Sequence, residues 1–307
     1  MLCGKVFSRY IHQNVGVFAV KCHPDVESMT PKFGCILPHD SADFDHLLEV
    51  ARTCEDLGYD SIWAFDHLAP YWTSSKSNLE CWTTLSSLAG HTKEIKLGSL
   101  VININLRHPS LLAKMASTLD VISRGRIILG LGTGDRLSKK ELTSFGYTFR
   151  SLDERISRLK ETIQILNGLW TTDDFSYDGM HFKLSHAQLA PKPVQKPHPP
   201  IWIGGKHYRI IDAVAEMADG WNYWNLTRKA STDKIQYLLE RCIQNNRAFD
   251  TIIKSWSGTI PGKLTIETLT TYLKERSSPA TEYFVAYFGP AARRETYELF
   301  AETVSKL

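Results

Sequence analysis

Short apolar runs alternate with longer amphipathic segments along the chain from Phe33 onward. The apolar runs have the length of buried strands, and the amphipathic segments repeat their apolar residues at the spacing of a helix. Because the runs are almost continuously apolar, they indicate strands of a parallel sheet that is covered on both faces. Strands are predicted at 33–37, 60–65, 95–101, 126–131, 201–205, 220–224, 252–256 and 281–288.

A predicted helix follows each predicted strand. Gly58 closes the first helix, and Ser151 and Glu154 have the spacing of a capping box at the start of the fourth. Helices are predicted at 41–57, 81–91, 108–123, 152–169, 207–217, 232–248, 265–276 and 291–305. Eight strand–helix units predict a (β/α)8 TIM barrel, which is an α/β fold. A doubly wound protein of two domains is the alternative, since periodicity does not reveal whether a sheet closes.

The alternation is interrupted between residues 171 and 200. The segment DDFSYDGMHFKLS is typical of a β-hairpin that turns at Asp178 and Gly179, and PKPVQKPHPP is typical of an extended polyproline connector. Both are predicted to form an insertion between the fourth helix and the fifth strand. Residues 1–32 lie outside the count of strands, so we expect an N-terminal extension of unknown structure there and a single barrel domain at 33–307.

The composition is that of a soluble globular protein rather than a nucleic-acid or membrane binder. Of the 307 residues, 36 are Lys or Arg and 33 are Asp or Glu, and the net charge of +3 argues against both partners. No apolar run is long enough to cross a bilayer. The short apolar patch at 15–20 leads to no small-residue cleavage site, so no signal peptide is expected. The six cysteines form no C-x-x-C pair, which predicts reduced thiols in a cytoplasmic protein.

A TIM barrel places its active site at the C-terminal ends of its strands. The residues at these predicted ends are His39 and Asp40, Asp66 and His67, Gly132 to Asp135, Gly204 to Lys206, and Tyr223 to Asn225. His67 suits a general acid or base because its ordinary pKa lies near neutrality, and Asp135 is its expected partner across the barrel mouth. Both aspartates could instead have purely structural roles. Asp66 could cap a helix or turn, and Asp135 could form an ion pair with Arg136.

Two glycine turns follow the fourth and fifth strands. Gly132 and Gly134 allow a ligand to approach the backbone closely, although GLGTGD matches neither a phosphate loop nor a dinucleotide fingerprint. Gly204 and Gly205 precede a helix whose first N–H groups suit an anion. A plain tight turn is the structural alternative in both places. The sequence shows no metal-ligand spacing, so no metal is expected, and no G-x-S-x-G or Cys/His signature supports covalent hydrolysis.

Three long segments resemble a known family. RHPSLLAKMASTLDVISRGRIILGLGTGD (107–135), PKPVQKPHPPIWIGG (191–205) and ADGWN (218–222) resemble the luciferase-like flavin barrel superfamily. The similarity runs from about Phe33 to Val304 in the right order, and the insertion after the fourth helix is in the family's place. A second strand that ends in Asp-His before aromatic residues resembles the branch that uses coenzyme F420, an 8-hydroxy-5-deazaflavin.

The resemblance implies contacts to the cofactor ring. Leu100 and Val101 fall where the family has a non-proline cis peptide that supports the back of the ring, and Asn103 falls where its pyrimidine edge is bound. The backbone contacts to the ring or its chain fall on Gly132, Thr133 and Gly134.

The resemblance also implies a phosphate-binding turn and catalytic positions. Gly204 and Gly205 match the phosphate-binding turn, and Asp66 is expected among the cofactor-binding residues. His67 matches a position near the hydride-carrying face of the ring. Asp135 falls where the sugar-phosphate dehydrogenase branch has its catalytic glutamate.

Residues expected near the substrate differ from those of the sugar-phosphate dehydrogenase branch. Tyr71 replaces a tryptophan that the branch uses near the substrate, Asp135 is shorter than its glutamate, and Thr227 falls where it has a phosphate-binding lysine. Glucose 6-phosphate is therefore not the expected substrate. Tyr71 and Trp224 are the expected pocket residues, and Trp224 narrows the pocket differently from the branches of the family.

The function that follows from the resemblance is hydride transfer between coenzyme F420 and a small organic substrate. The first alternative is an FMN-dependent monooxygenase of the same fold, which uses oxygen and a separate reductase for the flavin or F420. The second is a barrel that binds a flavin without turnover. Family membership also implies a homo-oligomer.

Overall fold

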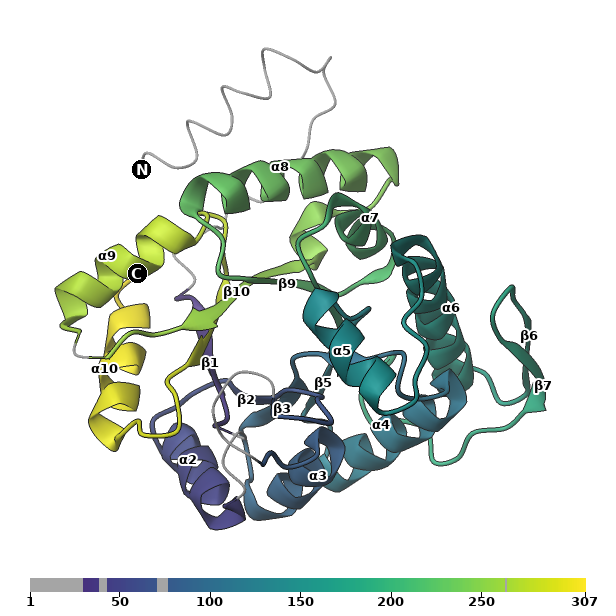
Figure 1. The fold of residues 1–307 in the computed structure, drawn as a ribbon, viewed down its shortest axis with the longest axis horizontal. Helices are drawn as coiled ribbons and strands as arrows, with labels where there is room; N and C mark the ends of the chain where they lie inside the picture. The colour runs from purple at the N-terminus through teal and green to yellow at the C-terminus, as the bar shows by residue number, and fades with distance from the viewer. Residues whose placement is uncertain (1–29, 39–42, 71–76, 263) are drawn as a thin grey trace.

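The computed structural model describes residues 30–38, 43–70, 77–262 and 264–307 (Figure 1). Its main sheet consists of parallel strands in the order β3-β2-β1-β11-β10-β9-β8-β5-β4, and a further pairing of β3 with β5 closes it into a barrel. The strands are β1 (Lys32–Ile36), β2 (Ser61–Ala64), β3 (Lys96–Ser99), β4 (Ile102–Asn103), β5 (Ile127–Gly132), β8 (Ile201–Gly204), β9 (Gly220–Trp224), β10 (Ile253–Thr259) and β11 (Tyr283–Tyr287). Because β4 continues β3 after a bulge, the strands correspond to the eight predicted ones. The predicted TIM barrel is confirmed.

A ring of helices surrounds this barrel (Figure 1). The helices of the ring are α2 (Phe44–Asp56), α3 (Cys81–His91), α4 (Pro109–Ser123), α6 (Leu152–Thr171), α7 (Tyr208–Met217), α8 (Arg228–Gln244), α9 (Ile266–Arg276) and α10 (Arg294–Val304), with a short 3-10 turn η1 (Phe249–Thr251) after α8. Each was predicted, and most begin and end within about three residues of the prediction. The exception is α8, which begins four residues early because the Thr227 side chain caps its first turn by accepting a hydrogen bond from the amide of Ala230.

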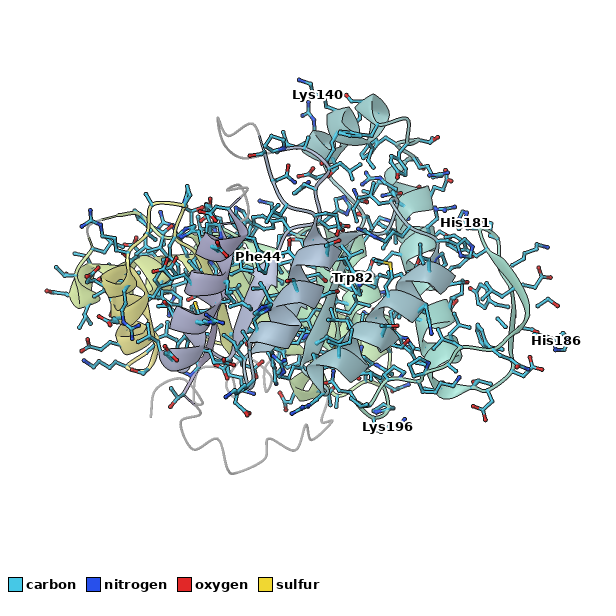
Figure 2. The ribbon with its side chains drawn as sticks, turned by 90° about the horizontal axis from the view of Figure 1, so that it is seen from below. Phe44, Trp82, Lys140, His181, His186 and Lys196 are labelled. Atoms are coloured by element: carbon cyan, nitrogen blue, oxygen red, sulfur yellow. The ribbon has the colours of Figure 1, made fainter. Side chains whose placement is uncertain are left out.

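Helix α5 (Arg136–Ser144) was not predicted, since this segment was expected to be part of a loop. Asp135 and Ser138 form a capping box at its start, which stabilises a helix of mostly polar residues. In Figure 1, α5 lies inside the ring of the other helices, across one end of the barrel. Figure 2 shows that the same helix, marked by Lys140, projects beyond that end.

The predicted insertion is confirmed as an antiparallel hairpin of β6 (Phe175–Asp178) and β7 (Lys183–Ala187). It lies outside α6, away from the barrel axis (Figure 1). The carboxylate of Glu161 on α6 holds the turn of the hairpin by accepting hydrogen bonds from three consecutive amides, those of Met180, His181 and Phe182. The proline-rich connector that returns to β8 contains cis peptides before Pro191 and Pro197.

The interior of the barrel is filled by side chains and forms a core separate from the one under the helices. Its fully packed residues are Ile36, Trp63, Leu100, Ile128, Trp202, Tyr283 and Val285. The rings of Trp63 and Trp202 lie 5.0 Å apart at the centre of this core. Phe65, Val101 and Trp224 pack against it but remain partly exposed. Since these three stand at the C-terminal ends of their strands, they form the floor of the barrel mouth.

Four cysteines fall within the described residues, and all are buried free thiols: Cys35, Cys54, Cys81 and Cys242. Burial raises the pKa of the Cys54 and Cys81 thiols well above the ordinary value. Among the helices described here, none is both long and apolar enough to cross a membrane. The proposed extension at 1–32 falls almost wholly outside the described residues, and Lys32 already belongs to β1.

Candidate functional site

The barrel brings the predicted site residues to one end of the molecule. Parallel strands place Asp66 and His67 after β2, Asn103 at the end of β4, and Trp224 at the end of β9 on the same rim. The two glycine turns follow β5 and β8 at that rim. Tyr71, the other predicted pocket residue, lies outside the described residues, as do His39 and Asp40.

Leu100 and Val101 form the bulge between β3 and β4, and the peptide bond between them is cis, as predicted. The Val101 side chain packs over Gly132 and Gly204, at the ends of the neighbouring strands. A β-carbon on Gly204 would lie 2.7 Å from Val101 Cγ1, and one on Gly132 would overlap Val101 Cγ2. These two glycines therefore make room for the Val101 side chain.

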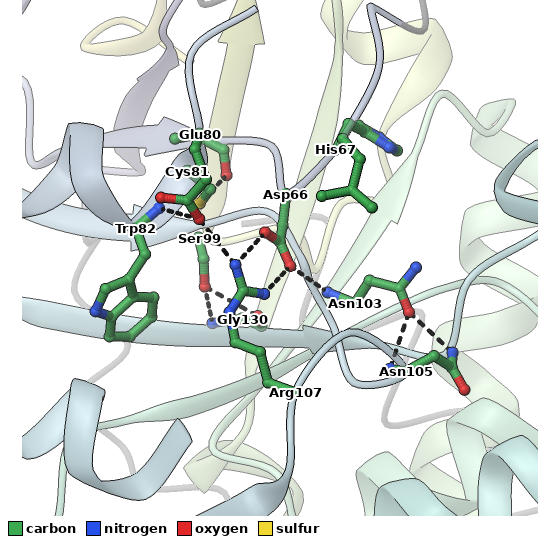
Figure 3. Close-up of polar contacts among 12 residues, drawn as sticks. Asp66, His67, Glu80, Cys81, Trp82, Ser99, Asn103, Asn105, Arg107 and Gly130 are labelled. Atoms are coloured by element: carbon green, nitrogen blue, oxygen red, sulfur yellow. Dashed lines mark hydrogen bonds and ion pairs between the residues drawn. The ribbon is translucent and has the colours of Figure 1, made fainter. Parts of the chain in front are cut away.

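Asp66 is buried in an ion pair with Arg107, the residue that precedes α4 by two positions (Figure 3). The two guanidinium nitrogens of Arg107 lie 2.6 and 2.9 Å from the two carboxylate oxygens of Asp66. Arg107 also donates to Glu80, the N-cap of α3, at 2.8 Å. The amide of Asn103 donates to Asp66 at 3.0 Å. Both Asp66 oxygens are thus engaged by protein, and its expected place among the cofactor-binding residues stays a prediction.

The Asn103 side chain is oriented by its neighbours. Its carbonyl oxygen accepts hydrogen bonds from the backbone and side-chain amides of Asn105 at 3.1 and 2.8 Å. Within the described part of the chain no hydrogen bond uses Asn103 Nδ2, and Figure 3 shows this atom pointing to the side of the site where His67 lies. Asn103 therefore presents a hydrogen-bond donor above the floor of the barrel mouth.

The loop after β5 is held from below by two side chains. The carbonyl of Thr133 accepts hydrogen bonds from Asn105 Nδ2 and Arg155 Nη1, both at 3.0 Å, and Arg155 also donates to the carbonyl of Gly134. Gly134 has φ +76°, a conformation that favours glycine. Because its carbonyls face the protein interior, this loop is fixed in place.

His67 is held at the rim by a carboxylate that the sequence prediction missed. Its Nδ1 lies 3.0 Å from Glu141 Oε2, on α5. The other carboxylate oxygen of Glu141 accepts hydrogen bonds from the amides of Leu68 at 2.5 Å and Ala69 at 3.0 Å. Burial on its own raises the pKa of Glu141, but the hydrogen bond and charge of His67 and these two amides together lower it. Glu141 therefore stays ionised and orients the His67 ring.

Asp135, predicted as the partner of His67, is the exposed N-cap of α5. Its carboxylate accepts hydrogen bonds from the amide of Ser138 at 2.8 Å and from the hydroxyl of Ser138 at 3.0 Å. The helix that Asp135 caps carries Glu141 to His67, and the catalytic role expected of Asp135 across the barrel mouth stays a prediction. The residues Ser138, Glu141 and Leu142 are the buried face of α5, and because only Leu142 is apolar, the sequence carries little hydrophobic periodicity at this helix.

The turn after β8 leads into α7 at the same rim. Gly205 has φ +138°, its amide donates to the carbonyl of Asn222 at 3.1 Å, and its own carbonyl accepts from Trp221 Nε1 at 2.7 Å. Lys234 lies over the ring of Tyr208, in the first turn of α7, at 3.9 Å. Burial and the charge of Lys206 lower the pKa of Lys234. This end of α7 therefore combines the positive end of a helix dipole with the nearby lysines Lys206 and Lys234, which suits an anion.

The polar groups at the rim surround an apolar and aromatic floor. Phe65 and Trp224 contact each other edge to face with ring centroids 6.1 Å apart, and Phe65 makes a similar contact with His67 at 6.1 Å. Over the described ranges, no group of three or more His, Cys, Asp or Glu side chains could hold a metal ion. The site thus offers a planar ligand an apolar surface, hydrogen bonds at the edge and an anion-binding turn.

Comparisons with curated proteins point to one family of enzymes. An F420-dependent hydroxymycolic acid dehydrogenase of Mycobacterium tuberculosis is 30% identical over 199 residues, which are 64% of this chain and 54% of that protein. An F420-dependent glucose-6-phosphate dehydrogenase of Microbacterium testaceum is 31% identical over 178 residues, 58% of this chain and 52% of that protein. The matched region therefore spans about half the length of these curated relatives.

Comparisons with solved structures support the fold. An F420-dependent secondary alcohol dehydrogenase in complex with an F420-acetone adduct has a TM-score of 0.76 at 16% identity, covering 90% of this chain and 98% of that one. The coenzyme F420 dependent tetrahydromethanopterin reductase from Methanopyrus kandleri has a TM-score of 0.73 at 18% identity, with the same coverage. The model of the luciferase-like monooxygenase family matches residues 15–302. This chain therefore belongs to the luciferase-like monooxygenase family.

Proposed function

We propose that this protein is an oxidoreductase that transfers hydride between coenzyme F420 and a small organic substrate, with His67 as its acid or base. The curated relatives reported above are named as F420-dependent dehydrogenases, which supports the cofactor. The observation that carries the proposal is the His67–Glu141 pair at the barrel mouth, 3.0 Å between Nδ1 and Oε2. Such a pair gives a histidine one defined tautomer at the place where a barrel enzyme binds its substrate.

The residues at the rim fit a deazaflavin. Val101, only partly buried, supplies an apolar surface for a planar ring, and Asn103 Nδ2 is a donor suited to a carbonyl of the pyrimidine edge. The turn at Gly204 and Gly205 suits the phosphate of the cofactor chain, for the reason given above. When bound, F420 would supply the carbon that gives or accepts a hydride.

A residue of this chain, His67, transfers the proton to or from the substrate oxygen. Because Glu141 accepts the hydrogen on His67 Nδ1, the unprotonated nitrogen of the ring is Nε2. In alcohol oxidation this nitrogen takes the proton of the substrate hydroxyl, and in the reverse direction the imidazolium returns a proton to the carbonyl oxygen. Phe65 and Trp224 exclude water from the floor of the site and give the substrate a shaped apolar wall.

Titration of the purified protein with F420 and with FMN tests the proposal directly. We expect saturable binding of F420, read from its fluorescence, with FMN binding weaker. Tight binding of FMN with oxygen consumption, a requirement for a separate reductase and no response to F420 would instead identify a monooxygenase. If the protein bound neither cofactor, the result would favour a non-catalytic barrel.

Replacing Glu141 with glutamine should lower turnover by about 10–100-fold, as loss of an orienting partner does for other functional histidines. The side-chain amide of the glutamine would donate to Nδ1 and select the wrong tautomer. F420 affinity should change little, since Glu141 contacts only His67 and its loop. The checks are steady-state kinetics and the F420 titration, and unchanged turnover would exclude an orienting role.

We also expect Glu141 to make the stability of the wild-type protein depend on pH, and the Glu141→Gln variant measures this effect. The folded pKa of Glu141 lies below its ordinary value of 4.5, so its contribution is present above that pH and is lost as pH falls through the folded pKa. At neutral pH we expect the wild type to exceed Glu141→Gln by about 1–2 kcal/mol in unfolding free energy. The difference should shrink as pH falls through the folded pKa of Glu141. Glu298→Gln, in an exposed pair with Arg294, should show almost no difference at either pH.

We propose that two copies of the chain associate through the outer faces of α3 and α4. On α4, Leu111 and Ile122 are 54% and 50% exposed, although the pattern placed them with the buried Leu112 and Leu119 on one face. The solvent-accessible residues of the neighbouring α3 are mostly small, namely Thr83, Ser86, Ser87 and Gly90 beside His91, and a β-carbon on Gly90 would meet no atom within 4 Å. An apolar ridge beside a flat helix suits packing against a second copy.

Light scattering should then report a dimer for the wild type and a monomer for the double variant Leu111→Glu, Ile122→Glu. Met180→Glu, at the exposed turn of the hairpin, is the control and should remain dimeric. A wild-type monomer at all concentrations, or a double variant that stays dimeric, would exclude this interface.

A further inference from the structure

Helix α5 carries two large apolar side chains that are exposed at the barrel mouth. Leu137 and Phe145 are each 53% exposed. Leu137 lies one turn before Glu141 and Phe145 one turn after it, so each projects within about 40° of Glu141 around the helix axis. Since Glu141 reaches His67, both apolar side chains flank the contact between α5 and the histidine.

The cations of α5 lie on other faces of the helix. Arg136, Lys139 and Lys140 project about 100° or more away from Glu141 around the axis. Figure 2 shows Lys140 pointing outward from the end of the molecule. The face beside His67 therefore offers apolar surface and no cation from α5, so it suits an uncharged hydrocarbon chain and not a phosphorylated substrate.

The loop after β2 continues this surface. Leu68, Ala69 and Pro70 are all partly exposed, and the Glu141 carboxylate binds the amides of Leu68 and Ala69 at 2.5 and 3.0 Å. One carboxylate thus holds His67, the apolar loop and α5 in a fixed arrangement. Exposed apolar side chains that are gathered beside a functional group are typical of a ligand-binding surface.

We propose that Leu137 and Phe145 bind the hydrocarbon chain of an aliphatic alcohol or ketone whose oxygen lies at His67. The proposal rests on the proposed function for the role of His67 and adds the chemical class of the substrate. Leu137 and Phe145 set the preference for substrates by the length of hydrocarbon chain that they cover. They take no part in proton or hydride transfer.

Calorimetric titration of the protein, without cofactor, with linear methyl ketones from butanone to decanone tests the surface itself. We expect the Kd to fall about threefold to fourfold for each added methylene, up to the length that the surface covers. In the double variant Leu137→Ala, Phe145→Ala the Kd of decanone should rise at least about tenfold, and that of butanone less than about twofold. Thermal unfolding shows whether the variant is folded, which its exposed positions lead us to expect.

Ile243→Ala is the matched control. Ile243 is 49% exposed near the C-terminal end of α8, at the opposite end of the barrel, and its loss should leave every Kd unchanged. The proposal is overturned if affinity does not depend on chain length, if the double variant keeps the dependence, or if no ketone binds. Because the F420 titration is a separate measurement, failure of the cofactor assignment and failure of this surface are distinguishable.

Discussion

Turnover is expected to fall by about 10²–10⁴-fold when His67 is replaced by alanine, while F420 affinity stays within about twofold. The reason is that His67 Nε2 is the nitrogen expected to exchange a proton with the substrate oxygen, and alanine offers no substitute. The measurements are kcat at saturating substrate and the F420 titration.

His186→Ala is the matched control for this variant. His186 Nδ1 lies 3.0 Å from an aspartate oxygen of Asp174, the same type of pair as His67 with Glu141, but it stands on the hairpin far from the barrel mouth (Figure 2). The turnover of the His186→Ala variant should equal that of the wild type. Equal turnover in His67→Ala would remove His67 from the mechanism, even if F420 binds as expected.

Asp66→Ala is expected to lower the free energy of unfolding by about 3 kcal/mol. Removal of this carboxylate leaves the Arg107 guanidinium with Glu80 as its remaining carboxylate partner and the amide of Asn103 without an acceptor. Because Asn103 then loses its anchor, F420 affinity should fall as well. Chemical denaturation gives the stability, and the F420 titration gives the affinity.

Two comparisons distinguish the loss of a buried ion pair from a general effect of truncation. Asp178→Ala removes one partner of an exposed pair with Lys183 and should change the stability little. The double variant Asp66→Ala, Arg107→Leu should regain part of the lost stability, since no unpaired charge remains buried. If Asp66→Ala were as stable as Asp178→Ala, the ion pair would have no part in holding the site.

The succession of strands and helices could be predicted because each element has a periodic pattern of its own. The apolar run at β5 and the stripe of α6 are visible within a few residues of sequence. Helix α5 escaped prediction because its nine residues are mostly polar and only Ser138, Glu141 and Leu142 are buried. A helix stabilised by a cap and one buried carboxylate has little hydrophobic periodicity to detect.

The roles of the site residues were harder to predict than their positions. Gly132 was expected to let a ligand approach the backbone, and the structure shows in addition that its missing β-carbon makes room for the Val101 side chain. Asp66 was identified at the rim, but its partner Arg107 is 41 residues away in the sequence. Contacts of this kind depend on which strands become neighbours, and no local pattern encodes that.

The sequence by itself determined the barrel and the end of it that carries chemistry, because strand polarity follows from the strand–helix order and parallel strands share one C-terminal rim. It also determined that His67 belongs to that rim. Only the tertiary structure decided that Glu141, 74 residues away, and not Asp135 orients this histidine. The physical reason is that burial of a carboxylate depends on what the fold packs against it. Here the fold supplies the imidazole and two backbone amides, which keep Glu141 charged.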